Sequence, residues 1–151
     1  MNVAEICKPH VVTVHGYDEL GTATRLMREK HVGYLVVVDP MPLAAKVRPV
    51  GVLTDRDIVV SVLAADVDPR TVRVADIMTR NPVVVSESQS IASALKQMRR
   101  IGVRRLPVVG DAGQLVGVLS LDDVVETLVR QLADVAGSIG RELSTEAQLR
   151  P

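Results

Sequence analysis

Apolar and polar positions along this chain follow two alternating patterns, which predict its helices and strands. From Asp18 to Lys30 and from Ser88 to Arg100, apolar residues recur at the three-to-four-residue spacing of an amphipathic helix. Short, nearly continuous apolar runs follow each helix, such as Gly33 to Val38 and Leu115 to Leu119. Because such runs leave no polar face, we expect strands buried on both faces, in a sheet covered by helices.

One heptapeptide occurs twice and marks the end of a strand in each half of the chain. Gly51 to Asp57 reads Gly-Val-Leu-Thr-Asp-Arg-Asp, and Gly117 to Asp123 reads Gly-Val-Leu-Ser-Leu-Asp-Asp. Each copy ends an apolar run and opens a helical pattern, so it predicts a strand, a tight turn and a helix N-terminus. The glycine allows another backbone or a ligand to approach the strand closely.

The hydroxyl and the carboxylate of each heptapeptide have two compatible interpretations. Thr54 with Asp57, and Ser120 with Asp123, have the spacing of a capping box, which satisfies free N–H groups of the first helical turn. Alternatively, the hydroxyl and the N–H groups face a phosphate while the carboxylate accepts hydrogen bonds from two ribose hydroxyls. The two roles are not exclusive, and the duplication shifts the balance toward the second.

The whole chain, and not only the heptapeptide, is an internal repeat. Val3 corresponds to Val74, an offset of 71 residues, and the helices and first strands match at the same offset. After a longer loop in the first copy the offset becomes 66, as from Gly51 to Gly117. Each copy predicts a short helical turn (Val3 to Cys7, Val74 to Met78), a short strand (Val11 to Val14, Val83 to Val85), a helix, two strands and a last helix.

The repeat predicts the fold class and the domain boundaries. We expect an α+β fold of two pseudo-symmetric β-α-β-β-α repeats, with residues 1–65 as the first repeat, 66–73 as a linker and 74–130 as the second repeat. Residues 131–151 form a C-terminal helical extension and tail. Because a unit of about 65–70 residues is marginal alone, the two repeats should pack on each other.

Composition narrows the class of function. Apolar residues make up 47% of the 151 residues, yet the chain has no Phe, no Trp and two Tyr, so aliphatic residues must build the core. Eighteen basic and eighteen acidic residues balance, which argues against a nucleic-acid binder. The N-terminus lacks a signal-peptide pattern, no run approaches the ~20 apolar residues of a membrane span, and one Cys excludes an internal disulfide. We expect a cytoplasmic protein without membrane contact.

The duplicated unit resembles a pair of CBS domains, the cystathionine-β-synthase-type modules that bind adenosyl compounds. The resemblance rests on Leu106-Pro107-Val108-Val109 before the hairpin and on Gly-apolar-apolar-[Thr/Ser]-x-x-Asp after it, and it covers residues 3–130. It implies a stand-alone tandem pair whose repeats pack sheet to sheet, with two clefts related by a pseudo-two-fold axis. It also implies a homodimer of pairs shaped as a flat disc.

The resemblance further implies that each cleft takes residues from both repeats. The first site would combine Thr54, Asp57, Met78, Val83, Val103, Arg104 and Arg105. The second site would combine Ser120, Asp123, Cys7, Val12, Val32, Gly33 and Tyr34.

The two sites differ in charge. Arg104 and Arg105 suit phosphate, whereas Gly33 and Tyr34 at the equivalent place offer no cation. We therefore expect AMP, ADP or ATP in the first site, with NAD and S-adenosylmethionine as secondary candidates, and a weaker, empty or less charged second site. The alternatives are a solvated charged corner for the arginines and ordinary core for the valines that would hold adenine.

Two features of the first repeat depart from the family pattern and bear on the second site. Val36 stands where the second repeat has Pro107, and a long Pro-rich loop runs from Asp39 to Lys46.

Other chemistry finds little support in the sequence. Cys7-x-x-His10, with His15 and His31, lacks the paired spacing of a structural zinc site, so we assign no metal. The chain has no nucleophile elbow, no P-loop and no G-x-G-x-x-G, so we assign no catalytic residue and no enzyme activity.

The C-terminal segment continues a helical apolar stripe beyond the second repeat, from Leu121 to Leu143. The stripe predicts a surface for a dimer or a partner, with packing on the chain's own core as the alternative. Residues from Ser144 to Pro151 are polar and are expected to fray.

Taken together, the sequence favours a non-catalytic adenosyl-nucleotide sensor that regulates an unidentified partner protein in trans. The alternative is a structural homo-oligomerisation module in which the two hydroxyl–carboxylate pairs only cap helices.

Overall fold

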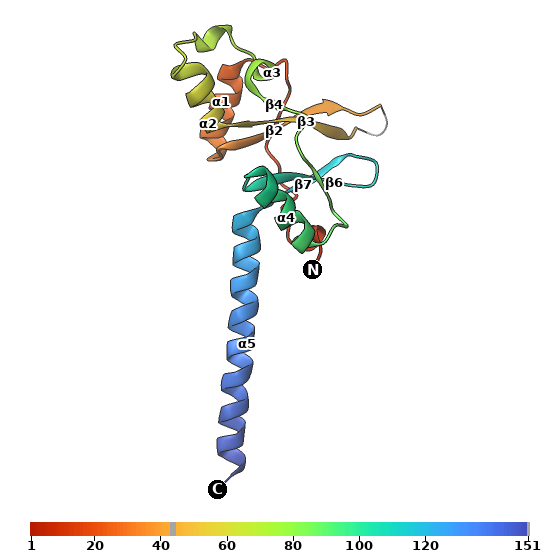
Figure 1. The fold of residues 1–151 in the computed structure, drawn as a ribbon, viewed down its shortest axis with the longest axis vertical. Coiled ribbons are helices and arrows are strands. Elements are labelled where there is room, and N and C mark those ends of the chain that lie inside the picture. Colours follow the sequence, from red (N-terminus) through yellow and green to blue (C-terminus); the bar gives the residue numbers. More distant parts are fainter. Residues whose placement is uncertain (43–44, 151) are drawn as a thin grey trace.

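Two small sheets lie next to each other at the centre of the molecule, and helices cover them from outside (Figure 1). The computed structural model describes residues 1–42 and 45–150. The first sheet has the order β1 (Thr13–Val14), β2 (Tyr34–Pro40), β3 (Val47–Thr54) and β4 (Thr79–Arg80). The second has the order β5 (Val85–Ser86), β6 (Arg105–Val109) and β7 (Leu115–Ser120). This arrangement confirms the predicted α+β fold of two packed repeats.

The two repeats have the same local topology. In each, a two-residue strand pairs in parallel with the next strand, which forms an antiparallel hairpin with the third. The predicted strands from Val11 and Val83 begin two residues later, at Thr13 and Val85, because only the last residues of each run reach the neighbouring strand. Most residues of the hairpin strands are buried or half-buried, as the continuous apolar runs predicted.

The two amphipathic helices pack as their spacing requires. Helix α1 (Leu20–Lys30) buries Leu20, Ala23 and Met27, and α4 (Ile91–Ile101) buries its equivalent residues. Both helices begin two or three residues later than the pattern indicated. In α4 the reason is its cap, since the Ser90 hydroxyl accepts a hydrogen bond from the Ser93 N–H at 3.2 Å.

The first helical turn of each repeat packs in the core of the other repeat. Val3, at the start of η1 (Val3–Glu5), is buried among residues of the second repeat. Val74, at the start of α3 (Val74–Ile77), is buried among residues of the first. The sequence predicted both turns but not this exchange, which ties the two repeats together through both of their cores.

The exchange explains the glycine of each heptapeptide. Lys8 exchanges two backbone hydrogen bonds of 3.0 Å with Val118, so its backbone runs beside Gly117. A Cβ on Gly117 would lie 2.8 Å from the Lys8 carbonyl oxygen, and a Cβ on Gly51 would lie 3.1 Å from the Thr79 carbonyl oxygen. Of the two interpretations of these glycines, the structure supports close approach of another backbone.

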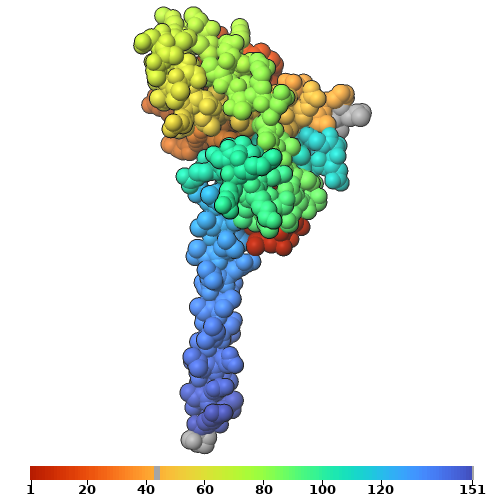
Figure 2. Space-filling view, viewed as in Figure 1, coloured from red at the N-terminus to blue at the C-terminus, as the bar shows by residue number. Residues whose placement is uncertain are grey.

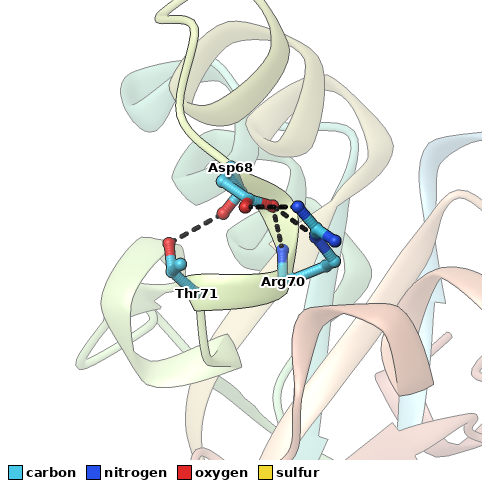
Figure 3. A network of polar contacts seen from close by, with 3 residues as sticks. All are labelled: Asp68, Arg70 and Thr71. Atoms are coloured by element: carbon cyan, nitrogen blue, oxygen red, sulfur yellow. Dashed lines mark hydrogen bonds and ion pairs between the residues drawn. The ribbon is translucent and has the colours of Figure 1, made fainter.

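The connection between the repeats is short and locally ordered. The chain passes from α2 (Asp55–Ile58) through the π-helical turn η2 (Val59–Leu63) to η3 (Pro69–Thr71). Asp68 caps η3, as Figure 3 shows: its Oδ1 accepts from the Arg70 N–H at 3.0 Å, and its backbone oxygen accepts from the Thr71 hydroxyl at 2.8 Å. The Arg70 guanidinium also donates to this carboxylate, which lowers the pKa of Asp68.

Helix α5 (Leu121–Leu149) begins in the second repeat and then projects far from the rest of the molecule (Figures 1 and 2). Within the described chain, Val124 is the one residue of α5 that is buried. The stripe therefore packs on the chain's own core only at Leu121 and Val124, and from Val125 to Leu143 it is exposed. The helix continues through the segment expected to fray and ends at Leu149.

Within residues 1–42 and 45–150, no helix combines the length and the apolar character needed to cross a lipid bilayer. The long loop of the first repeat includes Leu43 and Ala44, which lie outside the described residues.

Candidate functional site

The larger cleft lies where the two repeats meet and takes residues from both. We call it the first cleft. It has a volume of about 890 Å³ and lies at the end of β3, where Thr54 and Asp57 begin α2. Val83, Val103 and Arg105 face it from the second repeat. A volume of this size lies within the range of small-molecule sites in proteins.

A second cleft of about 410 Å³ lies beside the first and is built from the equivalent residues. Ser120 and Asp123 at the start of α5 stand in place of Thr54 and Asp57, and Val12 and Val32 stand in place of Val83 and Val103. Lys8 stands in place of Thr79. Residues that are equivalent in the sequence repeat therefore line equivalent positions of the two clefts.

The pseudo-two-fold axis passes close to Tyr34 and Arg105, which are equivalent residues of the two repeats. Both residues line both clefts. The Arg105 guanidinium carbon lies 5.8 Å from the centre of the Tyr34 ring, within the range of a cation–π contact. Burial raises the pKa of Tyr34 and the Arg105 charge opposes this rise, so the phenol stays protonated at neutral pH. Its hydroxyl has no hydrogen-bond partner within the described residues.

In the first cleft the capping box is formed and leaves one carboxylate oxygen for a ligand. The Thr54 hydroxyl accepts from the Asp57 N–H at 3.1 Å, and Asp57 Oδ2 accepts from the Thr54 N–H at 2.9 Å. Asp57 Oδ1 accepts no hydrogen bond within the part of the chain that the structure describes. The capping interpretation is thus confirmed, and it does not exhaust the hydrogen-bonding capacity of the carboxylate.

In the second cleft both oxygens of the equivalent carboxylate are engaged. Asp123 Oδ1 pairs with Lys8 Nζ at 2.6 Å, and Oδ2 accepts a hydrogen bond from the Ser120 hydroxyl. Burial raises the pKa of Asp123, but the hydrogen bonds from Lys8 and Ser120 outweigh it, so the pKa of Asp123 is lowered. The hydrogen bond to Asp123 in turn raises the pKa of Lys8.

The expected charge difference between the two sites is therefore wrong as stated. The second cleft does contain cations, because Lys8 and Arg105 both line it. The sequence comparison missed Lys8, although its equivalence to Thr79 places it at the same point of the repeat. What distinguishes the clefts is whether the carboxylate at the start of the helix is already paired.

The two arginines of the first site have different surroundings. Arg104 Nη2 donates to Asp122 Oδ1 at 2.8 Å on the exposed rim of the cleft. Arg105 lies over Tyr34 and makes no ion pair within the described residues. Arg105 is therefore the better placed of the two to meet an anionic group in the first cleft.

Two residues of the expected sites lie behind the clefts. Met78 packs against the first core, and a Cβ on Gly51 would lie 2.6 Å from its sulfur. Cys7 packs against the second core, where burial raises the pKa of its thiol. The other expected residues lie on the clefts: Thr54, Asp57, Val83, Val103 and Arg104 on the first, Ser120, Asp123, Val12 and Val32 on the second, and Gly33, Tyr34 and Arg105 on both.

The wall of the first cleft is partly apolar and open. Val83 and Val103 are 38% and 37% exposed, although both are large aliphatic residues in a well-packed molecule. Pro82 and Ile101 extend this wall. The core interpretation of the two valines is therefore wrong. Flat aliphatic surfaces of this kind can hold a planar heterocycle in a chain that has no Phe or Trp.

Within the described residues, His, Cys, Asp and Glu side chains form no group of three that could hold a metal ion.

Comparison with known proteins identifies the repeat. The sequence profile of the CBS domain matches residues 3–64 and 74–130. An uncharacterised protein of Methanopyrus kandleri is 31% identical over 126 residues, which cover 83% of this chain and 62% of that protein. The chain therefore spans less than two thirds of this relative.

Two solved structures extend the comparison. Hypoxic response protein 1 of Mycobacterium tuberculosis is 32% identical over 124 residues, which cover 82% of each chain. A solved structure of Hypoxic Response Protein I with two coordinated zinc ions is 31% identical, covers 83% of this chain and 98% of that one, and matches with a TM-score of 0.72. A CBS domain protein of Pyrobaculum aerophilum, solved in complex with AMP, matches with a TM-score of 0.73 and 26% identity, covering 89% of this chain and 99% of that one.

Proposed function

Because the chain belongs to the CBS-domain family as a tandem pair of domains, we propose that its first cleft binds an adenine nucleotide. AMP, ADP and ATP are the leading candidates, and the protein acts as a non-catalytic sensor. The observation that carries this proposal is the position of Asp57, which keeps one oxygen unpaired on a cleft that Arg105 also lines.

The residues of the first cleft fit the three parts of such a ligand. Asp57 Oδ1 accepts hydrogen bonds from the ribose hydroxyls, and the Thr54 hydroxyl lies beside it. Arg105 meets the phosphate, because a guanidinium donates two parallel hydrogen bonds to an anion. Adenine lies against the aliphatic wall formed by Val83 and Val103.

The second cleft is the weaker site in this proposal. A ribose there has to displace Lys8 from Asp123 before the carboxylate can accept its hydroxyls. Breaking this ion pair subtracts from the binding free energy. The second cleft therefore binds adenosyl ligands more weakly than the first, or not at all.

One relative supports the choice of ligand. The Pyrobaculum aerophilum protein was solved with AMP, and this chain matches it over 99% of its length. The identity of 26% supports the same class of ligand and leaves the choice among AMP, ADP and ATP to experiment.

Regulation follows from the position of the cleft between the repeats. A ligand held by residues of both repeats favours the arrangement of the repeats in which it makes the most contacts. This shift alters the surface offered to a partner protein, which the chain regulates in trans. Pairing of two such CBS pairs into a homodimer transmits the shift across a larger surface.

Calorimetric titration tests the ligand assignment. AMP should bind wild type more tightly than adenosine, because only AMP carries the group that Arg105 meets. Arg105→Ala should weaken AMP by about 10- to 100-fold, the usual worth of hydrogen bonds to a charged group, and leave adenosine nearly unchanged. Arg104→Ala is the matched control, since Arg104 pairs with Asp122. Equal affinity of both ligands for all three proteins would disprove the assignment.

A purely structural role is the second candidate, and one observation favours it. Thr54 and Asp57 form a complete capping box, and the Ser120 hydroxyl caps α5 by accepting from the Asp123 N–H. Thermal denaturation with AMP, ATP, NAD and S-adenosylmethionine separates the two functions. A ligand that binds only the folded state raises the melting temperature, and a structural module would show no rise with any of the four.

A further inference from the structure

Helix α5 carries an exposed apolar stripe that runs beyond the CBS pair. The stripe consists of Val125, Leu128, Leu132, Val135, Ile139 and Leu143. The family match ends at residue 130, so the last four residues of the stripe lie outside the CBS domains. Leu132, Ile139 and Leu143 are 69%, 54% and 63% exposed. Figure 2 shows this part of α5 standing clear of the rest of the molecule.

The spacing of the stripe is that of a helix–helix contact. Its residues alternate steps of three and four up to Ile139 and then take one step of four to Leu143. The charged residues Glu126, Arg130, Asp134 and Arg141 project from the other side of the helix, and Glu142 flanks the stripe near its end. From Val125 to Ile139, two identical stripes can therefore meet without bringing like charges together.

The helix itself needs a partner to be stable in water. Helical stability in proteins comes mostly from packing an apolar face, and α5 has little of its own chain to pack against. Gly137 and Gly140 each disfavour the helix by about 1 kcal/mol relative to Ala. Both lie within the unpacked part of α5.

The area of the stripe suits a second copy. Burying a Val, Leu or Ile side chain is worth about 1.5–3 kcal/mol at about 25 cal/mol per Å², which corresponds to about 60–120 Å² each. Two such stripes together bury about 1,000 Å², near the lower limit for a specific interface.

Charge argues against a membrane surface as the occupant. From Leu121 to Leu149 the helix has six acidic residues, two basic residues and no Lys. Helices that lie on anionic lipid carry Lys and Arg on their polar face. A stripe on an acidic helix suits another protein surface better than a lipid headgroup layer.

From these observations we propose that the exposed stripe of α5, from Val125 to Leu143, pairs with the same stripe of a second copy of the chain. The pairing is a two-helix contact along the stripe, separate from any contact between the CBS domains themselves. It joins two nucleotide-sensing units through a helical stalk.

Cysteine cross-linking tests which side of α5 faces another copy. In the full chain with Cys7→Ala, Val135→Cys places a thiol on the stripe, and Asp134→Cys is the matched control on the opposite side. Mild oxidation should give a disulfide-linked dimer with Val135→Cys at a rate at least about tenfold higher than with Asp134→Cys. Equal rates, or no dimer with either variant, would overturn the proposal.

Sedimentation equilibrium of the full chain gives a second measurement. Leu132→Glu combined with Ile139→Glu should weaken self-association by about 100-fold or more, because like charges then meet in the contact. Asp134→Ala combined with Arg141→Ala should leave it unchanged. A stripe variant that self-associates like wild type would contradict the proposal. Wild type that stays monomeric at 100 times the lowest concentration at which sedimentation can be measured would also contradict it. The same holds if wild type cosediments with phosphatidylserine vesicles and the stripe variant does not.

Discussion

At the scale of single residues, the two helix starts carry the same motif with different hydrogen-bond partners. Thr54 and Asp57 form a capping box that leaves Asp57 Oδ1 unpaired, whereas Lys8 and Ser120 engage both oxygens of Asp123. The sequence predicted a capping box at both helix starts, which only the first forms completely, and the resemblance implied both clefts. It could not predict the Lys8 contact, because that contact depends on how the N-terminal segment crosses to the other repeat.

Replacing Thr54 tests the double role. Thr54→Ala removes the cap and should lower the free energy of unfolding by about 1 kcal/mol. It should also weaken AMP binding measured at a temperature where the variant is fully folded. Thr54→Ser keeps the hydroxyl and should restore both quantities. If Thr54→Ala lost stability but bound AMP like wild type, the hydroxyl would be a cap alone.

The Lys8–Asp123 pair predicts a dependence of stability on pH. The pKa of Asp123 is lowered from its ordinary value of 3.8, and the pKa of Lys8 is raised from 10.5. The pair therefore stabilises the fold between these two values and loses this contribution as the pH falls through the lowered pKa of Asp123. Lys8→Met should lower the melting temperature at pH 7, and the difference from wild type should shrink as the pH falls below 3.8. A difference that is constant from pH 7 to pH 3 would contradict this.

At the scale of elements, the exchange of the first helical turns was the part of the fold that the sequence concealed. Periodicity predicted the turns from Val3 and Val74, since their apolar residues have to be buried somewhere. It could not show in which core each turn would be buried, because both cores are built from the same types of apolar residue. The glycines of the heptapeptides carried the missing information, since each marks the point where the other repeat's backbone passes.

Gly117→Ala tests the exchange directly. Its Cβ would lie 2.8 Å from the Lys8 carbonyl oxygen, and the backbone would have to shift. The variant should lower the free energy of unfolding by about 1–3 kcal/mol in denaturant titration, the usual range for overpacking. Gly137→Ala is the control, because nothing lies within 4 Å of that position in α5. It should be neutral or stabilising by up to about 1 kcal/mol. Equal effects of the two substitutions would argue against the close approach at Gly117.

At the scale of the whole molecule, two equivalent clefts meet at an axis marked by Tyr34 and Arg105. The symmetry of the repeat makes the clefts alike in shape, and the few residues that differ make them unlike in chemistry. The sequence showed the symmetry and the arginines, but the pairing state of each carboxylate is a property of the folded chain.

The number of adenosine molecules bound per chain tests whether the two clefts differ in affinity. Wild type should bind about one adenosine per chain in the concentration range that fills the first cleft. Lys8→Met frees Asp123 and should add a second adenosine in the same range, as counted by calorimetry or equilibrium dialysis. An unchanged stoichiometry would mean that Lys8 does not control the second cleft.

The most direct test of the nucleotide assignment is electron density in crystals of the full chain grown with AMP. Density for the ribose should lie against Asp57, with the phosphate at Arg105 and the adenine between Val83 and Val103. Density only beside Asp123, or none in either cleft at saturating AMP, would contradict the account.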